Sequence, residues 1–76
     1  MEDKIKEIMA AVFEIEPAAI NENSSPDNIE GWDSIRHMNL VVTLEEEFGI
    51  RLSDDQIADM NNYKQVVLTL KALGVQ

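Results

Sequence analysis

The sequence predicts an all-α protein: a small four-helix bundle with three longer helices, a short third helix, and a long loop between the first and second helices. Three observations favour this fold class. Apolar residues recur at helical spacing in four segments, no segment needs the alternation of a strand to explain it, and residues typical of helix ends divide the segments. We expect residues 1–76 to form a single domain with a modest core.

The first helix is expected over roughly residues 3–15, where apolar side chains form one stripe with charged residues opposite. Pro17 ends it, because the residue before a proline is pushed out of helical geometry. The connection over about residues 16–33 is long for a compact domain, and such loops are often functional. We expect Ile20 and Ile29 to anchor this loop to the helices, and a short helical turn to form within it.

The second helix is expected from about Ser34 to Phe48. Either Asp33 or Ser34 can cap its start, because a side-chain oxygen there satisfies backbone N–H groups that lack a helical partner. Gly49 follows the last residue and suits a left-handed cap. The face turned to the core is expected to consist of Leu40, Val41, Leu44 and Phe48.

Two further helices complete the bundle. The run from Ser53 to Gln56 matches a capping box and opens a short helix. Asn61 or Asn62 then caps the last helix, whose apolar residues keep helical spacing from Tyr63 until Gly74 ends the run.

Composition limits the function. Fifteen acidic and six basic residues give a net charge of −9, which opposes binding to nucleic acid or to an anionic membrane surface and favours partners with basic patches. The chain has no cysteine, so any thiol chemistry must come from an added group. The first residues show no basic start followed by an apolar run, and we expect a cytoplasmic protein.

The segment Gly31-Trp32-Asp33-Ser34-Ile35 carries the most chemical information. It is a turn that leads into a helix N-terminus, where free N–H groups and the helix dipole favour an anionic group such as a phosphodiester. A serine hydroxyl at this place is expected to be reachable by another protein. An ordinary capping serine explains the same spacing, so local physics leaves both interpretations open.

The wider pattern resembles the acyl carrier protein family. The residues that carry the resemblance are Asp33-Ser34-Ile35, the apolar-striped helix after them, its end Leu44-Glu45-Glu46-Glu47-Phe48, and the four-helix layout. The resemblance implies a non-enzymatic carrier with a covalent 4′-phosphopantetheine arm, delivered from coenzyme A to Ser34 by a phosphopantetheinyl transferase. It also implies that Asp33 helps to hold a transient magnesium ion during that transfer, with no resident metal.

The resemblance also implies partner enzymes that transfer, condense or activate acyl groups and carry basic docking patches. We expect these partners to contact a monomeric carrier along its second and third helices, at Arg36, His37, Asn39, Glu45, Glu46, Asp54 and Asp55. The acyl chain could shelter in a gap between helices lined by Ile35, Met38, Val42, Ile57 and Met60, although apolar residues at this spacing are as often ordinary core.

Two residues depart from the pattern of housekeeping fatty-acid carriers. Arg36 and Asn39 stand two and five residues after the serine, where those carriers are usually acidic. The departure, together with Trp32, suggests a discrete carrier of a specialised pathway; Trp32 could also pack at the hinge of the loop. His37 lies one turn after Ser34 and is expected at the surface beside the arm, touching the phosphate or a partner.

Four other interpretations of the sequence give different functions. A hydrolase built from Ser34, His37 and Asp33 is poor, because no third group is placed to orient the histidine. A calcium-binding loop fails on ligand spacing. An aminoacyl or peptidyl carrier, and a small acidic interaction module without a prosthetic group, stay open as alternatives to an acyl carrier for fatty acid, polyketide or related biosynthesis.

Overall fold

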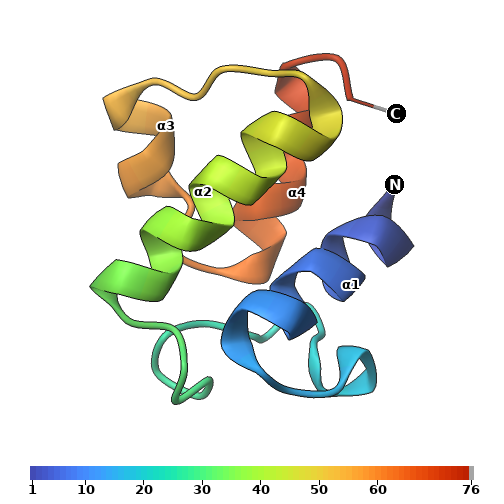
Figure 1. Ribbon diagram of the computed structural model, residues 1–76, viewed down its shortest axis with the longest axis vertical. Coiled ribbons are helices and arrows are strands. Elements are labelled where there is room, and N and C mark those ends of the chain that lie inside the picture. The colour runs from blue at the N-terminus through green and yellow to red at the C-terminus, as the bar shows by residue number, and fades with distance from the viewer. Residues whose placement is uncertain (76) are drawn as a thin grey trace.

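The computed structural model describes residues 1–75, and within them it contains helices and no strand (Figure 1). The elements are α1 (Glu2–Phe13), the 3₁₀ turn η1 (Pro17–Ala19), α2 (Ser34–Phe48), α3 (Asp54–Asp59) and α4 (Tyr63–Ala72). The predicted fold class, three longer helices with a short third one, is therefore confirmed. The helical turn expected inside the first loop is η1.

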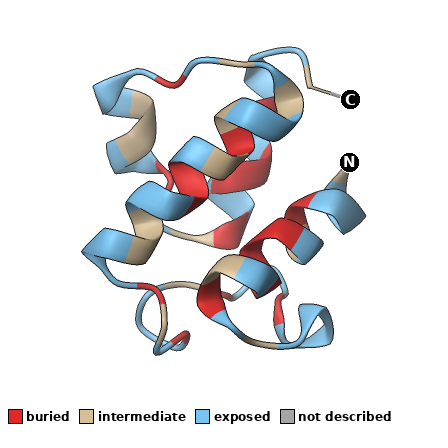
Figure 2. Ribbon diagram, in the orientation of Figure 1, coloured by how far each residue is buried: buried red, intermediate tan, exposed pale blue. Residues whose placement is uncertain are grey.

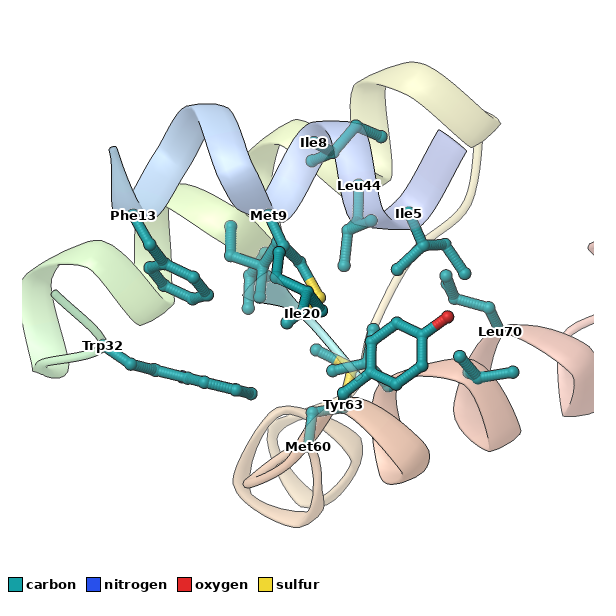
Figure 3. Packing of buried hydrophobic residues seen from close by; sticks show 14 of the residues in the cluster. Ile5, Ile8, Met9, Phe13, Ile20, Trp32, Leu44, Met60, Tyr63 and Leu70 are labelled. Carbon is teal, nitrogen blue, oxygen red and sulfur yellow. The ribbon is translucent and has the colours of Figure 1, made fainter. Parts of the chain in front are cut away.

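The core lies between the three longer helices, which turn their buried residues toward one another (Figure 2). α1 contributes Ile5, Met9 and Phe13, and its neighbours contribute residues that are equally inaccessible, as Figure 3 shows for part of the cluster. The fully buried side chains from the rest of the molecule are Leu40, Leu44, Met60, Val66 and Leu70. No helix within residues 1–75 is both long enough and apolar enough to cross a bilayer.

The start of α2 depends on the loop before it, and buried side chains hold that loop. Ile20, Ile29 and Trp32 are 2%, 6% and 4% exposed, so both expected anchors and the tryptophan pack into the core. The Ser24 hydroxyl accepts a hydrogen bond from the backbone N–H of Asn21 at 2.9 Å, and the Ser24 carbonyl accepts one from the N–H of Tyr63. The long loop is therefore tied both to itself and to the start of α4.

Most helix ends follow the sequence expectations. Gly49 ends α2 with a φ of 63°, Ser53 and Gln56 form the reciprocal capping box, and Asn62 rather than Asn61 caps α4. The first helix differs, because α1 stops at Phe13 and Glu14 adopts the left-handed conformation at φ 58°. Pro17 opens η1 instead of ending α1.

A candidate carrier site at the start of helix α2

Ser34 is the first residue of α2, and its side chain is exposed. The residue that caps the helix is Asp33, whose Oδ1 accepts a hydrogen bond from the backbone N–H of Arg36 at 2.8 Å. Sequence reasoning left the cap open between these two residues, and the structure assigns it to the aspartate. In the part of the chain from residue 1 to 75, no hydrogen bond engages the Ser34 hydroxyl. The serine is therefore free for chemistry.

The turn before Ser34 is fixed by a stacked aromatic pair. The ring of Trp32 lies on that of Phe13, with centroids 4.9 Å apart and an interplanar angle of 25° (Figure 3). Gly31 allows the two segments to approach closely, since a Cβ atom there would lie 2.8 Å from the Phe13 carbonyl oxygen. The C-terminal end of α1 therefore sets the position from which α2 begins.

His37 joins three segments of the chain, and sequence reasoning missed this role. The Trp32 indole N–H donates to His37 Nδ1 at 3.0 Å, and His37 Nε2 lies 2.9 Å from the carbonyl oxygen of Ile57 in α3. An indole N–H can only donate, so Nδ1 is the acceptor and Nε2 carries the proton that Ile57 accepts. The expected surface histidine beside the arm is a half-buried, neutral ring whose two nitrogens both have partners within the chain.

The two residues that depart from the housekeeping pattern lie on the side of α2 nearer to α1. The Arg36 guanidinium is 3.3 Å from Oε2 of Glu14, so it reaches back to the end of α1. Asn39 is exposed and borders a shallow groove between α1 and α2. Neither residue makes the base of Ser34 negative.

The expected acidic docking residues divide into two kinds. Glu46, Asp54 and Asp55 are exposed. Glu45 is half-buried, and its Oε2 accepts a hydrogen bond from the backbone N–H of Leu52 at 2.9 Å. This carboxylate holds the connection between α2 and α3 and is less available to a partner than the other three.

An open hollow of about 580 Å³ lies beside Ser34 between α2, α3 and the first loop. Ser34, His37 and Met38 share the α2 face that borders it, as their i, i+3, i+4 spacing requires. The full lining is Pro26, Trp32, Asp33, Ser34, His37, Met38, Asp54, Ile57, Ala58 and Asn61.

Only two of the five residues expected to shelter an acyl chain line this hollow. They are Met38 and Ile57. Ile35 is 76% exposed and Val42 is 50% exposed, and neither belongs to the lining. Met60 is 0% exposed and packs in the core, because the chain turns inward where α3 ends. The loop residues Pro26 and Trp32, which sequence spacing did not select, complete the hollow.

The residues present fit a phosphopantetheine group. The Ser34 hydroxyl makes no hydrogen bond within residues 1–75 and lies at the N-terminus of α2. The unpaired backbone N–H groups and the helix dipole at this end favour a phosphodiester. The adjacent hollow offers apolar surface within the first turns of the same helix. Within residues 1–75, no three acidic or histidine side chains converge on a common metal position.

The comparisons with known proteins agree with this site. Residues 3–70 match the family model described as "Phosphopantetheine attachment site". Acyl carrier proteins of Zymomonas mobilis and Lactobacillus acidophilus are 34% and 31% identical to this chain, which they match over 86% and 92% of its length. The matches cover 83% and 88% of those two relatives.

The fold comparison adds a solved structure from Mycobacterium tuberculosis, described as a candidate acyl carrier protein. It superposes with a TM-score of 0.85 and 21% identity, over 95% of this chain and 96% of that one. That likeness speaks for the fold. The family model and the relatives establish the class: a carrier that bears phosphopantetheine and is not itself catalytic. The chain belongs to the acyl carrier protein family. Membership implies two kinds of partner, a phosphopantetheinyl transferase and enzymes that handle acyl groups.

Proposed function

We propose that Ser34 is the attachment point of the arm and that the whole chain acts as one monomeric carrier domain in the cytoplasm. The observation that carries this proposal is that Asp33, and not Ser34, caps α2, which leaves the exposed Ser34 hydroxyl free. When attached, the arm supplies a terminal thiol that holds cargo as a thioester. The N-terminal N–H groups of α2 favour the negative charge that attachment brings.

Intact-mass measurement after incubation with coenzyme A, magnesium and a broad-specificity phosphopantetheinyl transferase tests this proposal. We expect one added phosphopantetheine on the wild-type protein and none on Ser34→Ala. Ser53→Ala is the matched control, because Ser53 also stands at a helix start but its hydroxyl accepts the capping hydrogen bond from Gln56 at 3.1 Å. Equal loading of Ser34→Ala and wild type would reject the attachment site.

Asp33 has two proposed roles, and two variants separate them. Its side chain caps α2, and we propose that it also binds magnesium during attachment of the arm. Asp33→Asn keeps a capping oxygen but removes the charge, whereas Asp33→Ala removes both. We expect both variants to load slowly and only Asp33→Ala to lose about 1 kcal/mol of stability. Loading of Asp33→Asn at the wild-type rate would argue against a magnesium role.

We propose an acyl cargo of a specialised pathway rather than of bulk fatty-acid synthesis. Trp32, Met38 and Ile57 give the hollow beside Ser34 an apolar surface that suits an acyl group. Arg36 and Asn39 leave the base of the arm without the negative charge that housekeeping partners are expected to read. An aminoacyl cargo is the alternative, since Asp33 and Asp54 also border the hollow and could face an amine.

The pathway proposal makes its own prediction. Changing Arg36→Asp together with Asn39→Glu should improve malonyl loading by a housekeeping malonyl transferase, because both changes place negative charge where basic docking patches meet it. Exposed Glu46, Asp54 and Asp55 would contact the same patches. Loading that is unchanged or worse in the double variant would contradict this account of the surface.

A further inference from the structure

The contact between α2 and α3 beside Ser34 is made by polar groups. We use the name His37 bridge for the two hydrogen bonds that link Trp32, His37 and Ile57. The Ile57 carbonyl belongs to the last turn of α3, where its backbone donor is the Met60 N–H at a long 3.4 Å. His37 supplies a second and closer donor from the neighbouring helix, at 2.9 Å. The bridge therefore fixes the spacing of the two helices at the edge of the hollow.

Trp32, His37 and Ile57 all line the hollow, so the bridge forms part of its wall. Opening the bridge would leave the indole N–H of Trp32, which is only 4% exposed, without a partner. The Ile57 carbonyl would keep only the long hydrogen bond from Met60. Leu40 and Met60 follow His37 and Ile57 by three residues each, and both side chains are 0% exposed in the core. Protein interiors at native density do not accept extra groups without displacement of their neighbours.

We propose that His37 is a specificity-determining residue that confines the cargo to the open hollow beside Ser34. On this account the carrier shelters short acyl groups there and leaves the distal part of a long chain in solvent. The inference rests on the proposed attachment at Ser34 and adds a statement about the cargo. His37 would act by holding Trp32 and Ile57 in place through its two hydrogen bonds.

The four methionines of the chain report where a cargo lies. Met38 borders the hollow and is 48% exposed, Met9 and Met60 are 0% exposed in the core, and Met1 lies at the start of the chain. Protein labelled with ¹³C on the methionine methyl groups would be loaded from butyryl-, octanoyl- or dodecanoyl-coenzyme A by the transferase. Intact mass would establish loading before methyl spectra are compared with those of the protein that carries the unacylated arm.

In the wild type we expect all three chains to shift the Met38 methyl signal and leave the Met9 and Met60 signals in place. In His37→Ala the octanoyl and dodecanoyl chains should shift the Met60 signal severalfold more than in the wild type. His37→Gln, which keeps an N–H donor of similar reach, should restore the wild-type pattern. Gln65→Ala, an exposed change on α4 outside the hollow, should match the wild type.

Two results would overturn the inference while Ser34 stays the attachment point. One is a Met60 shift in the wild-type protein when the long chains are loaded, and this result needs no variant to fold. The other is an identical set of spectra for the wild type and a folded His37→Ala. Absence of any mass gain would instead reject the attachment at Ser34, and the inference with it.

Discussion

Gly31→Ala tests whether close packing of the loop on α1 determines where Ser34 stands. A Cβ atom at this position would lie 2.8 Å from the carbonyl oxygen of Phe13 and 2.8 Å from Nη1 of Arg36. The guanidinium is the tip of a flexible side chain and can move. The Phe13 carbonyl is backbone at the end of α1, so the loop itself must shift away from the helix.

The magnitude follows from two opposing effects. Forcing an extra methyl group into a well-packed place costs about 1–3 kcal/mol, whereas replacing glycine with alanine stabilises by about 0.4–1 kcal/mol through the unfolded chain. The net expectation is a loss of about 1–2 kcal/mol of unfolding free energy. For a domain of this size that loss lowers the melting temperature by roughly 5–15 °C.

Urea and thermal unfolding measured by circular dichroism would give the change in stability, and intact mass would give the rate of arm attachment. Adding Arg36→Ala to Gly31→Ala should restore little, because the backbone contact with Phe13 persists. Gly49→Ala is the control, since its φ of 63° makes it costly by roughly 1–2 kcal/mol but it lies far along α2 from Ser34, so attachment should proceed normally. A Gly31→Ala protein within about 0.5 kcal/mol of the wild type, with normal attachment, would refute this reasoning.

Three further predictions concern the support of the site. Burial, and then the negative charge of Glu2, raise the pKa of the Tyr63 hydroxyl from 10.0 to about 12. The folded state therefore keeps this proton longer than the unfolded state, and the unfolding free energy should fall by at most about 2–3 kcal/mol as pH rises from 10 to 12. Urea unfolding of Tyr63→Phe over the same pH range should not show this fall. Met60→Ala should lower the unfolding free energy by about 2–5 kcal/mol, because the Met60 side chain is in the core. Ile35→Ala should change it by less than about 0.5 kcal/mol, because Ile35 is 76% exposed. Equal effects in urea unfolding would contradict the placement of Met60 in the core and Ile35 at the surface. Glu45→Ala should lose about 1 kcal/mol of unfolding free energy, because it loses the hydrogen bond from the Leu52 backbone N–H. Glu46→Ala should lose almost none, because Glu46 is exposed; the reverse order would contradict the structural role assigned to Glu45.

The sequence predicted those features that depend on local chemistry. The bounds of α2, the glycine cap at residue 49 and the capping box at Ser53 all follow from residues close together in the chain. Ile20 and Ile29 could be recognised as anchors because they are apolar residues in a polar loop. The exposed serine at a helix start was predictable for the same reason, once the surrounding pattern resembled a known family.

The features that sequence reasoning missed depend on segments far apart in the chain. His37 is bonded to Ile57, 20 residues away, and no local pattern announces that contact. Met60 has the same helical spacing as a groove residue, yet the turn after α3 carries it into the core. α1 ends at Phe13, before Pro17 would force it to end, because Glu14 takes a left-handed backbone conformation. The Glu14 carboxylate then forms an ion pair with Arg36 across the first loop.

The central claim is that the arm is attached to Ser34 and to no other hydroxyl. The chain has four serines, at positions 24, 25, 34 and 53. The Ser24, Ser25 and Ser53 hydroxyls each accept a hydrogen bond from a backbone N–H, whereas that of Ser34 is exposed and free within residues 1–75. Peptide fragmentation of the protein modified by the transferase should locate the whole phosphopantetheine signal on Ser34. Modification found on any of the other three serines, with Ser34 unmodified, would contradict the account.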